Sequence, residues 1–288
     1  MKILILDTWG KPYVNGVVPG GTEMVSLWLA KYLKADLFTS YTADKIDGVN
    51  FIFSKVPAKI FWKADDRSRQ FNIKRTKEII EIAHNYDLII NNSWITGHIS
   101  ALKDIKHATG KPMIHWWHLL AQFSFPFFQT IKSMNDAKRA GVFIATVTKF
   151  SSSAIDDIVD KKEKYIGYKT NPVDYTMYPF VSEVFEYHEP VGNYMYSASS
   201  LSEFKKVPHA VQIFAKLREI DPSLTFKVFI LNSDKNDYYY KFLKLVEQTK
   251  GVELFENRPR SESLNVAKNA KFGITYSLHK RIFWYCSS

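Results

Sequence analysis

Two histidines occur close together in the stretch PMIHWWHLLAQF, at the end of an apolar run. An imidazole at the end of a strand can hydrogen-bond a ligand or carry a proton, because its pKa lies near neutrality. We select His118 as the candidate for this role, and packing between the neighbouring tryptophans is the alternative for either histidine. A His-x-x-His pair without a nearby carboxylate or cysteine is a weak metal signal, so we expect no metal ligands.

A pair of glycines, Gly20 and Gly21, separates the first apolar run from an amphipathic stretch. Paired glycines let the backbone approach a ligand closely, and a following helix offers free N–H groups to phosphate or sugar oxygens. The sequence contains neither the three spaced glycines of a dinucleotide site nor a Walker loop. A turn that only connects a strand to a helix is the alternative.

Two adjacent lysines, Lys205 and Lys206, stand just before another amphipathic stretch. Their ammonium groups and the positive end of the helix dipole could act together on a diphosphate. Two solvated lysines on a loop are the alternative.

The chain carries an excess of positive charge, with 39 Lys and Arg against 29 Asp and Glu and a net charge of +10. Such a field attracts phosphate-rich partners, and nucleotide diphosphates, nucleic acid and anionic lipid all qualify. A general excess of surface lysines is the alternative. The single cysteine, Cys286, has no internal disulfide partner, which favours a reducing, cytoplasmic setting, and we find no signal peptide or membrane span.

Short apolar runs alternate with amphipathic stretches, and the pattern restarts near residue 194. The expected strands are 2–7, 35–41, 87–93, 112–118, 141–147, 193–199, 225–231, 251–256 and 271–277, and the expected helices are 22–33, 75–86, 97–105, 207–220, 237–249 and 261–270. This alternation predicts an α/β fold of two Rossmann-like parallel-sheet domains, residues 1–185 and 186–288, that face a cleft. Ligands of such sheets bind at the carboxyl ends of the strands, so the loops there should decide function.

Taken together, these motifs resemble, in order and spacing, the retaining, glycogen-synthase-like group 1 glycosyltransferases of the GT-B fold. That family has a Gly-Gly turn after its first strand, a strand ending in histidine, an Asn-Gly-Val-Asp segment followed by Phe-x-Pro, and a Lys-Gly pair before a helix ending in Ala-Phe. The matching residues are, in that order, Gly20, Gly21, Thr22 and Glu23; His118; Asn171, Pro172, Val173, Asp174, Tyr178 and Pro179; and Lys205, counted back from Phe214. The resemblance covers nearly the whole chain.

The resemblance implies that a sugar passes from a nucleoside-diphosphate sugar to an acceptor hydroxyl with retention, usually without a metal. His118 would contact the donor sugar near the reacting centre, and the turn formed by residues 20–23 would line the acceptor side. Lys205, together with Lys206, would neutralise the leaving diphosphate, which is the electrostatic work that such a reaction needs.

The chain departs from the family at the diphosphate site. Ser200 stands where the family has an arginine five residues before the lysine, and Lys206 stands where it has glycine. Lys206 could act as a substitute point charge, although it lacks the bidentate fork of arginine. Ser200, Lys205, Lys206 and, after the last expected strand, Ser277 are the expected nucleotide-sugar residues.

The tail RIFWYCSS replaces the Glu-x-Phe-Gly-Ile motif that the family places after Ser277. Read one base later, the codons from Arg281 to Cys286 encode Glu-[Phe/Ser/Tyr]-[Phe/Ser]-Gly-[Ile/Thr]-[Val/Ala] when the arginine codon is AGA or CGA. We therefore hypothesise an out-of-frame end, a truncated second domain, and weak or no sugar transfer by this chain. An aromatic tail that packs on the second sheet is the alternative.

The residues leave the acceptor open. Positive charge and compactness favour a hydroxymethylated base in DNA, as in some phage enzymes of this architecture. The competing acceptor is a glycan or lipid at a membrane surface, and a non-catalytic sugar-binding or nucleic-acid-binding remnant is a third possibility. Peripheral membrane contact would require an exposed aromatic patch, expected from Trp116, Trp117, Phe123, Phe125, Phe127 and Phe128.

Overall fold

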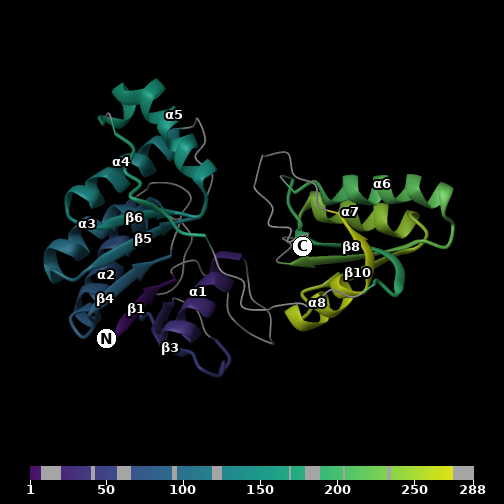
Figure 1. Cartoon of the computed structure of the whole chain (residues 1–288), viewed down its shortest axis with the longest axis horizontal. Coiled ribbons are helices and arrows are strands. Elements are labelled where there is room, and N and C mark those ends of the chain that lie inside the picture. The colour runs from purple at the N-terminus through teal and green to yellow at the C-terminus, as the bar shows by residue number, and fades with distance from the viewer. Residues whose placement is uncertain are drawn as a thin grey trace. The chain divides into compact units, whose positions relative to one another are not determined.

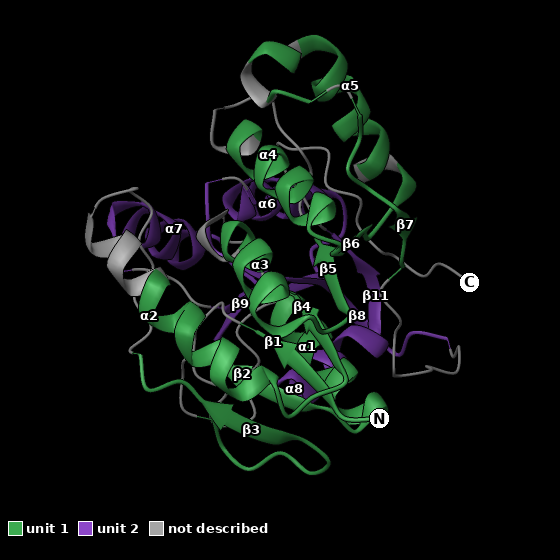
Figure 2. Ribbon diagram, turned by 90° about the vertical axis from the view of Figure 1, so that its left-hand side faces the viewer, with its two compact units in different colours: residues 1–14, 18–183 green, residues 15–17, 184–288 purple. Residues whose placement is uncertain are grey.

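The structure of the protein is a computed structural model that describes residues 1–7, 21–39, 43–56, 66–92, 96–118, 125–168, 170–178, 189–203, 205–231 and 235–274. Its contacts divide the chain into two compact units, drawn in two colours in Figure 2. Unit 1 comprises Met1–Val14 and Val18–Glu183, and unit 2 comprises Asn15–Val17 and Val184–Ser288. Each unit contains one parallel sheet and its own helices.

Unit 1 is built on a seven-stranded sheet with the strand order β3-β2-β1-β4-β5-β6-β7, in which every neighbouring pair is parallel. Its strands are β1 (Ile3–Leu6), β2 (Asp36–Thr39), β3 (Asn50–Phe53), β4 (Leu88–Asn91), β5 (Met113–Trp117), β6 (Phe143–Thr146) and β7 (Tyr175–Thr176). Its helices are α1 (Gly21–Leu33), α2 (Asp66–Ala83), α3 (Thr96–Thr109), α4 (Phe125–Arg139) and α5 (Lys149–Ile166).

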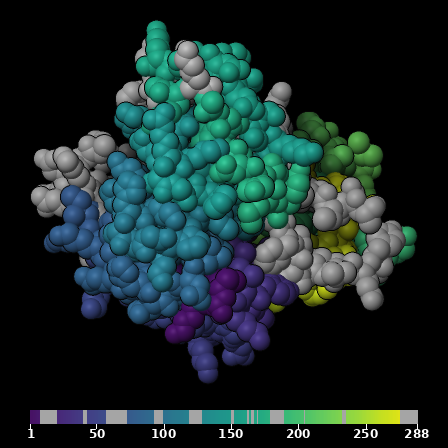
Figure 3. Space-filling model, turned by 60° about the vertical axis from the view of Figure 1, so that its left-hand side comes forward, coloured from purple at the N-terminus to yellow at the C-terminus, as the bar shows by residue number. Residues whose placement is uncertain are grey.

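Alternate residues of the central strands enter two different cores. In β1, Leu4 and Leu6 join the core beneath α2 to α5, whereas Ile3 and Ile5 join the core beneath α1. Figure 2 shows α2, α3 and α4 side by side over the first of these faces, and in Figure 3 the blue and teal atoms of this part of the chain form a continuous outer surface. Because both faces are covered, the strands read as unbroken apolar runs.

Unit 2 contains a four-stranded parallel sheet with the order β10-β9-β8-β11. Its strands are β8 (Gly192–Ser200), β9 (Thr225–Leu231), β10 (Val252–Glu256) and β11 (Ala270–Gly273), and its helices are α6 (Val207–Ile220), α7 (Asp237–Gln248) and α8 (Arg260–Lys268). In Figure 1, α6 and α7 lie on one side of this sheet and α8 lies on the other.

Helix α6 forms because its apolar residues recur at helical spacing. Val207, Ala210, Val211 and Phe214 are buried and pack against the sheet. Pro208 lies in the first turn, where its missing N–H costs no intrahelical hydrogen bond. Lys206 at the N-cap has φ 47° and ψ 38°, a left-handed conformation that glycine adopts more readily.

The predicted fold class, α/β with two Rossmann-like parallel sheets, is confirmed. Each expected strand and helix overlaps one in the structure, but α2 begins at Asp66, nine residues before the expected start at residue 75. Strands β3 and β7 and helices α4 and α5 are not among the elements expected from the sequence.

Candidate functional site

The carboxyl edge of the unit 1 sheet contains a topological switch point. The chain runs outward from β1 through β2 to β3, and β4 then lies on the opposite side of β1. Doubly wound sheets bind ligands in the crevice at such a reversal. Asp7 after β1 and Asn92 after β4 are both buried at this point, and His118 follows the adjacent strand β5.

A hydrogen-bond network centred on Asn92 holds His118. The Oδ1 atom of Asn92 lies 2.5 Å from Nε2 of His118. The Nδ2 atom of Asn92 donates to the Thr22 carbonyl at 2.9 Å and to the Ser26 hydroxyl at 2.7 Å. The first turn of α1 and the end of β5 therefore belong to one site.

His115 in β5 and His118 directly after it are both neutral at physiological pH. Burial, followed by the nearby imidazole of His115, lowers the pKa of His118 to about 3. Burial also lowers the pKa of His115 to about 4, against the opposing effect of a hydrogen bond to the Asn91 backbone. A neutral imidazole has one donor and one acceptor nitrogen, so His118 can hydrogen-bond a ligand without adding positive charge.

His115 and His118 pack on opposite faces of the sheet. The His118 ring lies 4.9 Å from Trp116, which belongs to the core beneath α1. The His115 ring lies 6.1 Å from Trp117 in the other core, and its Nδ1 is 2.8 Å from Nδ2 of Asn91. His115 is completely buried. The packing alternative is therefore correct for His115, whereas His118, which also packs against Trp116, lies at the carboxyl edge of the sheet and stays a candidate for the site.

The glycine turn is described from Gly21 onward, and Gly20 lies outside the described residues. Gly21 is the first residue of α1, and a methyl group added to it would meet no described atom within 4 Å. Among the described residues, none would clash with a side chain at this position. The Thr22 carbonyl takes part in the Asn92 network, and Glu23 is buried in the first turn of α1.

The carboxyl edge of unit 2 has its own switch point, between β8 and β11. Ser200 ends β8 and is exposed. The chain then turns, with the backbone N–H of Lys205 donating to the Ser202 carbonyl at 3.0 Å, and α6 begins after Lys206. Both lysines thus directly precede the N-terminus of α6 at the carboxyl edge of the unit 2 sheet, and their role in binding stays a prediction. Ser277 and the tail lie outside the described residues.

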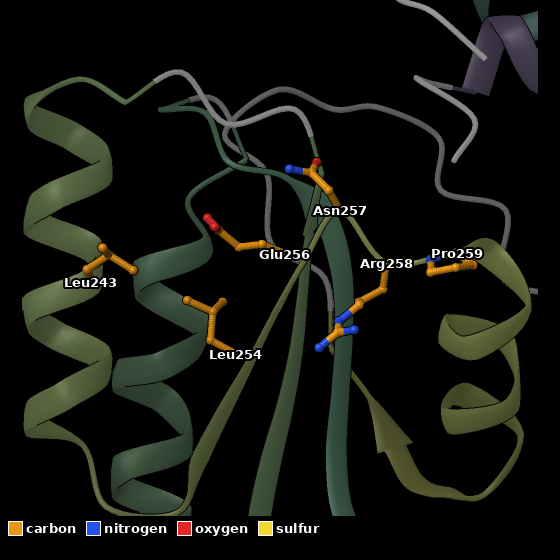
Figure 4. A pocket seen from close by; sticks show the side chains of 6 residues that line it. All are labelled: Leu243, Leu254, Glu256, Asn257, Arg258 and Pro259. Atoms are coloured by element: carbon orange, nitrogen blue, oxygen red, sulfur yellow. The ribbon is translucent and has the colours of Figure 1, made fainter. Parts of the chain in front are cut away.

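A pocket of about 490 Å³ opens at the carboxyl end of β10 (Figure 4). Leu243 of α7 and Leu254 of β10 form its apolar part. Its polar part is formed by Glu256, Asn257 and Arg258, and Pro259 completes the lining. This pocket was not predicted, although the polar run ENRP at the end of an apolar strand was a signal for it.

The Asn-Pro segment matched to the family serves the fold of unit 1. Asn171 donates to the Ser152 carbonyl at 3.0 Å and to Asp156 of α5 at 2.8 Å. Asp174 accepts from the Ile144 backbone N–H at 2.8 Å and pairs with Lys138 of α4 at 2.8 Å. These contacts connect the edge of the sheet to α4 and α5. Of the residues matched to Phe-x-Pro, Tyr178 is exposed and Pro179 lies outside the described residues.

The expected aromatic membrane patch is wrong for three of its members. Trp116, Trp117 and Phe128 are buried in the cores of unit 1. The indole N–H of Trp116 donates to the Met177 carbonyl at 2.9 Å, which satisfies its polar group inside the protein. Phe123 and the side chains of Phe125 and Phe127 lie outside what the structure describes.

Within the described ranges, the His, Cys, Asp and Glu side chains form no group of three or more that could hold a metal ion. The helices of these ranges are too short or too polar to cross a bilayer.

No protein-family model and no curated protein sequence matches the chain. Solved structures do resemble it. Anabaena HepE in complex with UDP and glucose superposes with a TM-score of 0.60 at 15% identity, over 96% of this chain and 74% of HepE. The α,α-trehalose 6-phosphate synthase of Burkholderia multivorans gives 0.64 at 9% identity, over 96% and 78%.

An α-glucosyltransferase in complex with UDP and a 13-mer DNA is similar to a comparable extent. It gives a TM-score of 0.57 at 11% identity, over 97% of this chain and 73% of that one. At these identities the likeness concerns the fold. The chain therefore has the two-sheet fold of these solved structures.

Proposed function

We propose that the chain is a glycosyltransferase that moves a sugar from a nucleoside-diphosphate sugar to an acceptor hydroxyl with retention. The observation that carries this proposal is the carboxyl edge of unit 2, where Lys205 and Lys206 precede α6 and a pocket opens two strands away. Solved structures of the same fold contain UDP or UDP-glucose, which supports a nucleotide sugar as the donor.

The dimensions of this edge suit a nucleotide. Neighbouring strands lie about 4.8 Å apart, so the ends of β8 and β10 are separated by roughly 10 Å, a distance that a nucleoside can bridge. The base would rest on Leu243 and Leu254, and Glu256 and Arg258 offer an acceptor and donors to its polar rim. A pocket of this size is ordinary for small-molecule binding.

The diphosphate would lie at the start of α6. The free N–H groups of a helix N-terminus attract anions, and two ammonium groups beside them add charge that grows more important as the diphosphate leaves. Ser200 at the end of β8 can contribute a hydroxyl hydrogen bond.

Unit 1 would receive the acceptor and the transferring sugar. We assign the residues around the glycine turn, Gly20, Gly21, Thr22 and Glu23, to the acceptor side and His118 to the donor sugar. The neutral imidazole of His118 is suited to a hydrogen bond with a sugar hydroxyl, because it adds no charge that would compete with the lysines for the phosphates.

The acceptor we favour is a hydroxymethylated base in DNA. The net charge of +10 favours a polyanion, and a solved glucosyltransferase of similar fold is in complex with DNA. A lipid acceptor has less support, because half of the aromatic patch that it would require is buried in unit 1.

The donor assignment predicts that Lys205→Ala and Lys206→Ala each weaken UDP binding, by about 10-fold or more, because each removes a charge-assisted contact. Isothermal titration with UDP and UDP-glucose measures this. Lys216→Ala is the matched control, since Lys216 is an exposed lysine of the same helix whose ammonium pairs with Glu219. Equal losses in all three variants, or no heat from the unmodified chain, would contradict the assignment.

The acceptor assignment predicts that the chain binds hydroxymethylated duplex DNA, and mass spectrometry would detect any transferred sugar as a hexose mass increment. Gel-shift affinity for the duplex should fall steeply between 50 and 200 mM salt, because binding releases counterions. Co-flotation with anionic liposomes and no shift of DNA would instead favour the membrane acceptor.

A further inference from the structure

The orientation of the Asn92 amide is determined by its partners. The Thr22 carbonyl can only accept, so the atom of Asn92 that lies 2.9 Å from it must be the donating amino group. The Ser26 hydroxyl accepts a hydrogen bond from the second N–H of that group, and it donates its own O–H to the same Thr22 carbonyl at 3.2 Å. The Oδ1 atom of Asn92 is thereby directed at His118.

This orientation decides which nitrogen of His118 carries the proton. Oδ1 has no proton to give, so the 2.5 Å contact with Nε2 requires His118 to be the donor. In a neutral imidazole the other nitrogen, Nδ1, then holds a lone pair. The low pKa of His118 agrees with a neutral ring at the pH at which the protein would work.

Asn92 is itself held rigidly. Its backbone N–H donates to the Leu6 carbonyl at 3.1 Å, which fixes it to β1 at the switch point, and its side chain is completely buried. One residue thus joins β1, the first turn of α1 and the end of β5.

We propose that Asn92 is a positioning residue that fixes His118 as the Nε2–H tautomer and so presents Nδ1 as the acceptor for a hydroxyl group of the bound sugar. The second half of this inference rests on the proposed function, and the first half does not. Through Ser26 and Thr22, the same amide makes the orientation of the imidazole depend on the first turn of α1, where the acceptor would bind.

The tautomer is tested without any ligand, by NMR of the full chain with ¹⁵N-labelled histidine. The unmodified chain should show His118 protonated on Nε2 alone. In Asn92→Leu, which has a similar shape and no acceptor, His118 should become a mixture of the two neutral tautomers. An unchanged spectrum of His118 in this variant would overturn the proposal.

A second variant covers the possibility that Asn92→Leu does not fold. Asn92→Asp keeps an acceptor toward Nε2, so the tautomer should persist, and its carboxylate should raise the pKa of His118. A pKa of His118 that does not rise in Asn92→Asp would also overturn the proposal. Asn91→Leu is the matched control, because Asn91 contacts the imidazole of His115 on the opposite face and should leave His118 unchanged.

The sugar contact is tested by comparing UDP-glucose with UDP. Asn92→Leu should weaken UDP-glucose binding by about 3-fold to 10-fold, the cost of one neutral hydrogen bond, and leave UDP binding unchanged. Equal weakening of both ligands would overturn the role of Nδ1. If no variant binds either ligand while the tautomer shifts as expected, the proposed function fails and the positioning of His118 by Asn92 stands.

Discussion

At the scale of single residues, the two histidines show how position on a strand separates packing from a candidate site. His115 points into a core, and His118, three residues later, points to the other face at the end of the strand. Both lose much of their basicity to burial. Burial therefore has two consequences. It keeps His118 neutral where a ligand would bind, and it makes the stability of the folded chain depend on pH, because protonating either imidazole inside the protein is unfavourable.

We expect unit 1 to lose stability as the pH falls below about 6.5. The folded pKa of His115 is about 4, below the ordinary value of 6.5, so between these values the unfolded chain binds a proton that the folded chain does not. The stabilisation by neutral His115 is therefore complete above pH 6.5, the pKa of histidine in the unfolded chain. It is lost as the pH falls toward about 4, the pKa of His115 in the folded chain. From pH 7 to pH 5 the loss from this residue is about 2 kcal/mol.

Urea unfolding of the chain and of His115→Gln at both pH values measures this contribution. Glutamine cannot titrate, so the variant should show a weaker pH dependence by that amount. The same pH dependence in both proteins would show that His115 is not the group responsible.

At the scale of elements, the start of α6 combines two demands on one position. Lys206 is held in the left-handed conformation at the N-cap and makes no side-chain capping hydrogen bond, yet its charge lies where the diphosphate would bind. The left-handed conformation costs a lysine about 1 to 2 kcal/mol, and glycine avoids this cost.

We therefore expect Lys206→Gly to raise the free energy of unfolding of unit 2, by about 0.5 to 1 kcal/mol after the greater entropy of glycine in the unfolded chain is subtracted. The same variant should weaken UDP binding. Lys206→Ala separates the two effects, because it removes the charge and keeps the strained backbone, so it should weaken binding with little change in stability. Denaturant unfolding and UDP titration of both variants measure these effects. A lower free energy of unfolding in Lys206→Gly would show that the backbone of Lys206 is not strained.

The elements that were not expected from the sequence, among them α4, α5 and β7, lack a clear apolar periodicity or start signal. Helix α4 begins with the aromatic and proline-containing segment FPFF, which is not typical of a helix start. In α5, three consecutive serines follow Lys149 and Phe150 in the first turns. Strand β7 has only two residues and is defined by its neighbours, since Asp174 and Asn171 secure it to β6 and α5.

At the scale of the whole molecule, the chain contains separate cores. The two cores of unit 1 lie on the two faces of one sheet, whereas the described core of unit 2 is built on a different sheet. We therefore expect each unit to unfold as its own cooperative region. A ligand stabilises only the folded region that binds it, by about 2.7 kcal/mol at 100 times its dissociation constant.

We expect heating of the full chain to give two transitions, of which only that of unit 2 moves to higher temperature with UDP. Differential scanning calorimetry measures the transitions, and hydrogen exchange with peptide-level readout assigns each one to its unit. A shift confined to unit 1 would contradict the assignment of the nucleotide to unit 2.

The sequence by itself determined the fold class, because parallel strands covered on both faces produce short apolar runs between amphipathic helices. It also indicated His118 and the lysines before α6 as candidate site residues, because ligands of such folds bind at strand ends, and their roles stay predictions. Only the tertiary structure decided the rest. Asn92 and His118 are 26 positions apart and meet because β4 and β5 are neighbours, and the burial of Trp116 depends on the helix that covers it. Spacing along a chain indicates which residues share a strand or a helix, whereas hydrogen-bond partners and burial arise from contacts between elements.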